Sequence, residues 1–330
     1  HPHLHSFPTR RSSDLILLKR SEDNGKTWSK ESVVWSDDRN TCGNPCPVVD
    51  ETTGRIWLFL TWNNGLDPES KIIAKTSVDT RKPFLCFSDD DGLTWTAPVN
   101  MESELKDPSW GWYATGPGTG IQIKNGKYKG RMVIPANHSY DDPEGNVRST
   151  PHGYGAHVLY SDDHGKTWRM GPQIKPGCNE SQVTELTGGT LVMNMRSYNK
   201  KFSRAVSFSH DGGETWTPVQ HDLQLVESVC QASILHAGDF RGKTIHLFSN
   251  PAVPSGRTHM TIKSSFDDCQ NWSNSKLVFS GPSAYSCLAQ LKNGRIALFY
   301  ECGDKGAYEN LQFISFPIKE LFSTEKLVSR

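Results

Sequence analysis

The sequence predicts an all-β protein, and three observations lead to this fold class. Residues typical of aromatic strands and tight turns are abundant, with 10 Trp, 28 Gly and 19 Pro among 330 residues. A turn motif recurs along the chain, each time after a short strand-like run. No stretch has the long 3.6-residue periodicity of an amphipathic helix. Repetition of this kind is typical of a β-propeller, in which four-stranded sheets surround an axis.

The repeated turn has the pattern Ser-x-Asp-x-Gly-x-Thr-Trp. It occurs at residues 21–28, 88–95, 161–168 and 209–216, and a degenerate copy at residues 265–272 carries Cys269 and Asn271 instead of Gly and Thr. Asp can accept the N–H groups of a turn, Gly supplies a backbone conformation closed to other residues, and Trp can pack back onto the sheet. We therefore interpret the motif as structural and its Asp residues as non-catalytic.

The spacing of the turns predicts the number of sheets. The copies start 67, 73, 48 and 56 residues apart, or about 61 on average, so 330 residues hold between five and six repeats. We expect a six-bladed propeller in a single domain over residues 16–330, since no linker-like segment interrupts it. Further apolar strands are expected at residues 55–62, 191–196, 244–249 and 295–301.

Residues 1–15 do not resemble the rest of the chain. The segment HPHLHSFPTRRSSDL has neither strand alternation nor helical period, and it lacks the apolar centre of a signal peptide. We interpret it as a non-native, adaptor-like segment. The pattern that follows begins in the middle of a strand, so we expect the first strands of the propeller to be missing.

Composition excludes several classes of function. Lys and Arg (36) balance Asp and Glu (36), which argues against a general nucleic-acid binder. No run of 18 apolar residues could span a membrane. The eight cysteines lack the spacing of a zinc site or disulfide scaffold and are expected to be buried thiols. The Gly-rich residues 116–120 lack the Lys of a phosphate-binding loop, and we expect no metal or cofactor.

Four copies of the turn match the Asp box, and here the sequence resembles the bacterial and animal sialidases (neuraminidases). More specific motifs support the resemblance: NESQVTEL at residues 179–186, NMR at 194–196, FSNP at 248–251 and SAYSCL at 283–288. The resemblance implies that Glu180 and Tyr285 are the catalytic pair. It also implies that Arg196 and Arg257 bind the substrate carboxylate.

The chemistry of sialic acid explains these residue types. Its anomeric carbon carries a carboxylate, which arginines bind in a bidentate manner without losing their charge. That carboxylate would repel a carboxylate nucleophile, whereas a neutral Tyr avoids the repulsion. A free phenol has a pKa of about 10 and needs a base, here Glu180, to take its proton during attack. The resemblance thus implies a retaining exo-α-sialidase acting on sialylated glycans.

Other contacts are expected from the same resemblance. Asn44, in the segment at residues 42–50, would reach a ring hydroxyl, and Trp62 would form a wall of the N-acetyl pocket. Asn137 and His138 would meet the glycerol tail, beside the loop at residues 112–122. Each has an ordinary structural interpretation as well, as a packed or loop residue.

The resemblance leaves two functional positions unmatched. The family's first carboxylate-binding Arg and its general-acid Asp lie upstream of the first Asp box, and counting back from Ser21 leads into residues 1–15. We therefore expect impaired activity. The sequon at Asn179, beside Glu180, favours a bacterial source, in which the protein would be secreted, periplasmic or at the cell surface.

Several alternatives remain open at this stage. A trans-sialidase would share the same motifs. A sialic-acid lectin or sortilin-like receptor could keep the propeller without the Tyr–Glu pair. A xyloglucan-type glycosidase also carries Asp boxes, but it would need two catalytic Asp residues and gives no reason for the order Glu, Arg, Arg, Tyr.

Overall fold

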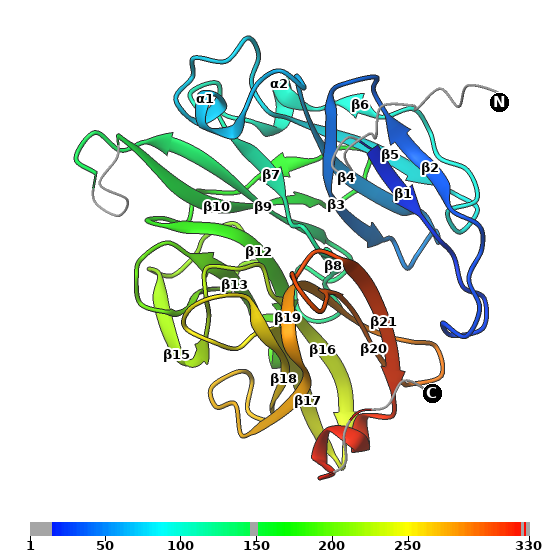
Figure 1. Cartoon of the computed structure of the whole chain (residues 1–330). Helices are drawn as coiled ribbons and strands as arrows, with labels where there is room; N and C mark the ends of the chain where they lie inside the picture. The colour runs from blue at the N-terminus through cyan, green and yellow to red at the C-terminus, as the bar shows by residue number, and fades with distance from the viewer. Residues whose placement is uncertain (1–14, 146–150, 325–326, 328–330) are drawn as a thin grey trace, which may run out of the picture.

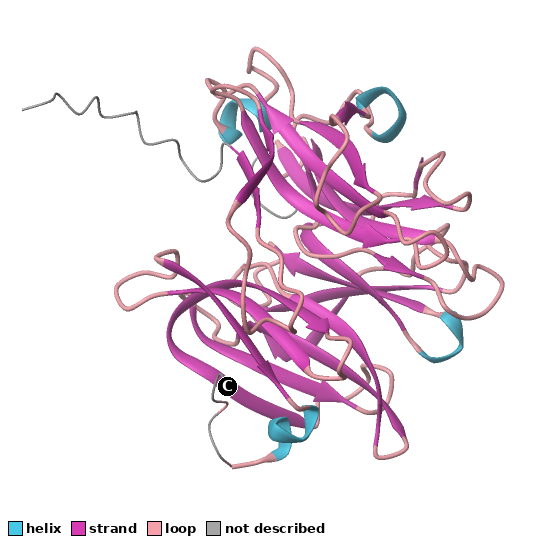
Figure 2. Cartoon of the chain, turned by 90° about the vertical axis from the view of Figure 1, so that its right-hand side faces the viewer, coloured by secondary structure: helices cyan, strands magenta, loops and turns pink. Residues whose placement is uncertain are grey.

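The chain forms antiparallel sheets that follow one another around the molecule in a propeller-like arrangement (Figure 1). The computed structural model describes residues 15–145, 151–324 and 327. The all-β prediction is confirmed: strands make up nearly all of the regular structure, with helical turns at the periphery (Figure 2). No helix in the described part of the chain is long and apolar enough to cross a membrane.

The first two sheets come from the N-terminal part. Strands β1 (Leu15–Leu18) and β2 (Ser32–Ser36) pair with each other. The second sheet has the order β3-β4-β5-β6. Its strands are β3 (Thr41–Val49), β4 (Ile56–Asn63), β5 (Lys82–Ser88) and β6 (Val99–Asn100). Leu15, which fell in the segment interpreted as non-native, is the first residue of β1; residues 1–14 lie outside the described part.

The third and fourth sheets form the middle of the chain. The third has the order β11-β10-β9-β7, with β8 also paired to β9. It contains β7 (Tyr113–Thr115), β8 (Ile121–Gln122), β9 (Met132–Asp141), β10 (His152–Ser161) and β11 (Arg169–Met170). The fourth contains β12 (Cys178–Glu185), β13 (Leu191–Ser197), β14 (Ser203–Ser209) and β15 (Gln220–Val226) in sequence order.

The remaining strands form one continuous six-stranded sheet. They are β16 (Ser233–Phe240), β17 (Lys243–Pro251), β18 (Thr258–Ser265), β19 (Asn274–Gln290), β20 (Ile296–Cys302) and β21 (Asn310–Phe316). The long strand β19 joins two halves: residues 274–282 pair with β18, and residues 283–290 pair with β20.

In the described part of the chain, helical structure is limited to short segments outside the sheets. The two α-helices are α1 (Glu69–Ile73) and α2 (Glu102–Leu105), and 3-10 turns occur at Thr187–Gly189 and Ile318–Phe322. The four strands expected from apolar runs are confirmed as β4, β13, β17 and β20, within two residues at each end. The eight cysteines are free, and six of them are buried.

The Asp boxes have the turn geometry expected from their sequence. In the copy at residues 161–168, the Asp163 carboxylate accepts the N–H and the hydroxyl of Thr167, and the Ser161 hydroxyl accepts the N–H of Gly165. The degenerate copy keeps this pattern, because Cys269 donates its N–H to Ser265 and the Asn271 amide replaces the Thr hydroxyl. The structural interpretation of these Asp residues is confirmed.

Each box also contacts the sheet before it. Gly165, with φ +83°, lies so close to Trp57 of the second sheet that a Cβ would be 2.2 Å from the indole. Gly25 of the first box has the same relation to Phe313 of β21, and Trp28 meets Phe313 edge to face at 4.9 Å. The first turn of the chain therefore packs against the last strand.

The Gly-rich segment at residues 116–120 connects strand β9 of the third sheet to strand β12 of the fourth sheet through hydrogen bonds. Gly116 donates a hydrogen bond to the carbonyl of Pro135, and its own carbonyl accepts the N–H of Ser181 in the fourth sheet. A Cβ on Gly120 would lie 2.5 Å from Ile134 and 2.6 Å from the carbonyl of Val133. Small residues are needed here because backbone from several sheets converges.

Candidate active site

Four side chains singled out in the sequence meet where strands of two sheets begin or end. Glu180 lies near the start of β12, Arg196 near the end of β13, and Tyr285 within β19; Arg257 immediately precedes β18. A register shift in β19 between Ser283 and Ser286 places Tyr285 at an irregularity. Strand ends and irregularities of this kind can direct side chains out of the regular sheet pattern.

Tyr285 and Glu180 are in direct contact although 105 residues separate them. The phenol donates a short hydrogen bond to the Glu180 carboxylate. Arg196 Nη1 donates to the other Glu180 oxygen at 2.7 Å and to the Tyr285 oxygen at 3.4 Å. Glu180 is only 8% exposed, so this carboxylate is held mainly by the two partners.

Burial and charge set the protonation states of this group. Burial, followed by the negative charge of Glu180, raises the pKa of the Tyr285 phenol. Burial alone would lower the pKa of the Arg196 guanidinium, but the charge of Glu180 together with Tyr198, Tyr285 and the hydrogen bond to Glu180 raises it. At neutral pH the site therefore contains a protonated phenol and a fixed cation.

Arg257 lies on the other side of the Tyr285 ring. Its guanidinium carbon is 5.7 Å from the centre of that ring, Nη1 donates to the Tyr308 hydroxyl, and Nη2 donates to the carbonyl of Val229 at 3.2 Å. These partners are uncharged, so the positive charge of Arg257 is not neutralised by a carboxylate among its hydrogen-bond partners in the described chain. Two guanidinium groups thus lie beside Tyr285, and that of Arg196 forms an ion pair with Glu180.

Asn44 and Trp62, two other expected contact residues, bond to side chains outside this group. Asn44, with φ +51°, accepts hydrogen bonds from Arg81 and from Thr61. Trp62 donates to Asp37 at 2.5 Å and packs near Phe84.

Asn137 and His138 occupy buried positions. Asn137 accepts a hydrogen bond from Asn179, the neighbour of Glu180, at 3.3 Å. His138 is fully buried, stacks on Trp110 at 3.5 Å, and contacts His157 at 3.0 Å. Burial, with the charge of His157 second, lowers the pKa of His138, which favours the neutral ring. This arrangement makes His138 part of the core rather than of an open surface.

The sequence interpretation missed two residues of this region. Arg81 is 5% exposed, and its hydrogen bonds go to the neutral side chains of Asn44, Asn63 and Thr61. Burial lowers its pKa to about 10. Tyr198 accepts a hydrogen bond from Arg196 Nη2 at 2.8 Å. No sequence pattern distinguished these two, because their partners belong to other strands.

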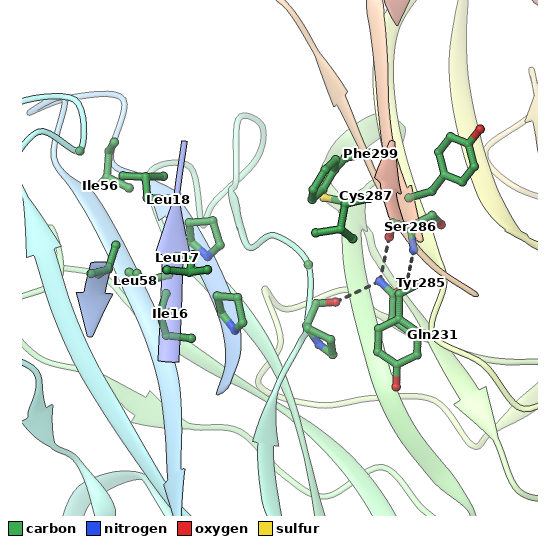
Figure 3. A pocket seen from close by; sticks show the side chains of 18 of the residues that line it. Ile16, Leu17, Leu18, Ile56, Leu58, Gln231, Tyr285, Ser286, Cys287 and Phe299 are labelled. Carbon is green, nitrogen blue, oxygen red and sulfur yellow. Dashed lines mark hydrogen bonds between the residues drawn. The ribbon is translucent and has the colours of Figure 1, made fainter. Parts of the chain in front are cut away.

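A cavity of about 720 Å³ borders the site (Figure 3). Ile16, Leu18 and Leu58 lie on one side of it, whereas Tyr285, Ser286 and Phe299 lie on the other. Gln231 links Ser286 to Pro117, since it donates to the carbonyls of Pro117 and Ser286 and accepts the N–H of Ser286. Tyr285 lines this largely apolar space, whereas Glu180, Arg196 and Arg257 do not.

The fold repeats antiparallel sheets with Asp-box turns, and it contains a cluster of Tyr, Glu and Arg side chains. Together these features define a class of propeller proteins. Residues 10–298 match the BNR repeat-like domain, and the chain belongs to this family. It is 34% identical to a sialidase of Bacteroides fragilis over 87% of this chain and 54% of the relative, and 32% identical to a sialidase of Micromonospora viridifaciens over 89% and 46%. The solved structure of the Hadza microbial sialidase Hz136 is 31% identical, with a TM-score of 0.78 over 93% of this chain and 60% of that one.

These comparisons confirm the resemblance to the sialidases and the propeller character of the fold. The chain spans about half the length of the two curated relatives. In the described residues, no group of three or more His, Cys, Asp or Glu could hold a metal ion.

Proposed function

We propose that this chain is a retaining exo-α-sialidase domain that releases terminal sialic acid from glycans. The contact of the Tyr285 hydroxyl with the Glu180 carboxylate carries the proposal, since it joins a nucleophile to a base. The Tyr285 oxygen attacks the anomeric carbon while Glu180 accepts the phenolic proton, and the bond to the leaving oxygen breaks as that oxygen takes a proton from water. A second water molecule then attacks the anomeric carbon and releases a proton to solvent, the bond to Tyr285 breaks, and the Tyr285 oxygen takes its proton back from Glu180. The two displacements at the same carbon retain the configuration.

Arg196 and Arg257 supply the electrostatic part of this mechanism. Arginine binds a carboxylate through paired N–H donors and stays charged throughout the pH range of proteins. Two such groups beside Tyr285 would hold the anomeric carboxylate and stabilise the negative charge of the phenolate as it forms. Binding of a sugar does not require the Tyr–Glu contact, so this contact favours an enzyme over a lectin.

The test is a direct assay of the chain with an aryl α-sialoside, whose phenol leaves readily. We expect hydrolysis, with α-sialic acid as the first product detected by NMR. Tyr285→Phe should reduce kcat by at least about 10³-fold while binding persists, because the ring remains and only the nucleophilic oxygen is lost. Tyr113→Phe is the control, since Tyr113 is fully buried and its hydroxyl lies 3.2 Å from His157 Nε2, away from Glu180. Equal activity in Tyr285→Phe and the parent would reject Tyr285 as nucleophile.

We also propose a six-bladed domain over residues 16–330. The two halves of β19 pair with different neighbours, which allows the six-stranded sheet to count as two blades. With the sheets beginning at β1, β3, β7 and β12, this gives six. The packing of the first box on Phe313 supports a ring in which the first and last blades are neighbours.

A further inference from the structure

A buried ion pair lies beneath the two arginines of the site. Arg204 of β14 and Glu227, just after β15, are 0% and 1% exposed, and Arg204 Nη1 lies 2.6 Å from Glu227 Oε2. Removing both charges from water is unfavourable, and such a pair is often no more stabilising than apolar side chains of the same size. The contacts of the Arg204–Glu227 pair indicate a role other than stabilisation of the fold.

The pair holds the strand that carries Arg196. The second oxygen of Glu227 accepts the N–H of Ser197, the next residue after Arg196, at 2.7 Å. Arg204 Nε donates to the Asn194 side chain, two residues before Arg196, at 2.6 Å. The ion pair is thus bonded to residues on both sides of Arg196, to the backbone N–H of Ser197 and to the side chain of Asn194.

The pair also holds the loop that receives Arg257. Arg204 Nη1 donates to the carbonyl of Cys230 at 2.7 Å, and the neighbouring carbonyl, that of Val229, accepts the hydrogen bond from Arg257. Val229 has φ +56°, a left-handed conformation that is unfavourable for a β-branched residue. Such strain persists only where the surroundings impose it, and it is concentrated at functional sites.

We propose that Arg204 and Glu227 are positioning residues that fix Arg196 and Arg257 relative to each other. This inference rests on the proposed function, in which these two arginines bind one carboxylate. Two guanidinium groups of like charge repel each other, so their spacing needs external support. One ion pair bonded to the flanks of Arg196 and to the Val229–Cys230 segment provides it.

The experiment replaces the pair while keeping its volume. Arg204→Met with Glu227→Leu removes both charges together, which avoids leaving one buried charge alone. Glu227→Gln is a milder variant that retains an oxygen for the Ser197 N–H, and it carries the test if the double variant does not fold. Arg131→Met is the matched control, since Arg131 is 5% exposed and pairs with Asp162 and Glu214 in the third and fourth sheets.

The first measurement is the preference for a carboxylate. In a Tyr285→Phe background, binding of the α-methyl sialoside is compared with binding of its methyl ester. We expect the preference for the acid to fall at least about tenfold in the pair variants and to stay unchanged in Arg131→Met. An unchanged preference in the pair variants, or an equal fall in the control at a similar melting temperature, would overturn the proposal.

The second measurement does not depend on activity. If the parent neither binds nor cleaves sialosides, the proposed function fails, and the Nε–Hε NMR signals of Arg196 and Arg257 still decide on the positioning role. We expect both signals to shift or broaden in the pair variants and not in Arg131→Met. Signals that remain in place would overturn the inference.

Discussion

At the scale of single residues, the charge environment separates the arginines into two groups. Arg131, Arg196 and Arg204 are each paired with a carboxylate. Arg257, by contrast, donates to a phenol and a backbone carbonyl. Because Arg257 donates to neutral groups and not to a carboxylate, it is a stronger candidate than Arg196 for direct contact with a substrate carboxylate.

Replacement of this residue tests that role. Arg257→Met should raise KM for an aryl sialoside by about 10–100-fold, since a hydrogen bond to a charged group contributes about 1.5–3 kcal/mol. Arg169→Met, on the exposed strand β11, should leave KM unchanged. Steady-state kinetics of the parent and both variants measure KM. A KM of Arg257→Met equal to that of the parent would exclude Arg257 from the carboxylate site.

At the scale of elements, the Asp box is a local structure with an electrostatic component. Asp90 accepts the hydroxyl and the N–H of Thr94, and it also accepts the Ser88 hydroxyl. These bonds, that of the Thr94 hydroxyl foremost, lower the pKa of Asp90 to about 2. The turn is therefore stabilised by a carboxylate that stays ionised in moderately acid solution.

The pH dependence of stability follows from this lowered pKa. A carboxyl group whose pKa is lower in the folded state than in the unfolded state stabilises the fold fully at pH values above its unfolded pKa of about 3.9. This contribution is lost as the pH falls through its folded pKa of about 2. Asp90→Asn should therefore lower the melting temperature above pH 4, with a difference that shrinks between pH 4 and pH 2. Asp91→Asn is the control, because that side chain lies outside the bonds of the turn. A difference independent of pH would contradict the assignment.

Contact between a box and the preceding sheet can be tested separately. Gly165→Ala forces a Cβ into Trp57, which should cost about 1–3 kcal/mol for overpacking, in addition to about 1–2 kcal/mol for the left-handed backbone. Gly54→Ala shares the backbone conformation, with φ +80°, but has open space around it. Urea unfolding should show the larger loss for Gly165→Ala; equal losses would mean that the indole moves aside freely.

At the scale of the whole molecule, the first Asp box and the last strand are connected through aromatic packing. Trp28 and Phe313 lie 285 residues apart in sequence, yet their rings are in edge-to-face contact. A double-mutant cycle with Trp28→Ala and Phe313→Ala should give a coupling of about 0.5–1.5 kcal/mol. Trp28→Ala combined with Val99→Ala, in another sheet, should be additive. Additivity in both cycles would show that the first box does not help to close the ring.

The parts of the fold that the sequence predicted are those with local causes. The boxes were recognisable because Asp163, Gly165 and Thr167 interact within a few residues of each other. The strands around Leu191 and Ile296 were recognisable because apolar runs between turn residues form them. Glu180 and Tyr285 were found only through the resemblance, since no local pattern joins residues 105 positions apart.

The buried pair shows what sequence interpretation could have found and did not. Arg196 attracted notice as a charge at the end of an apolar strand, where an unpaired charge would be costly. Arg204 is followed by Ala205 and Val206 in strand β14, which also contains three Ser residues, so the same argument would have predicted a buried partner less strongly. It could not have named Glu227, because that pairing depends on how β14 and the segment after β15 meet.

The sequence by itself determined the all-β class, the repeated turns and the residue types of a sialidase-like site. These follow from turn chemistry, from hydrophobic patterning and from ordered motifs, all of which can be observed along one chain. Only the tertiary structure decided which side chains touch: Tyr285 with Glu180, Arg196 between them, and Arg204 with Glu227 beneath. The physical reason is that hydrogen bonds and ion pairs act over a few ångströms, and folding alone brings distant residues within that range.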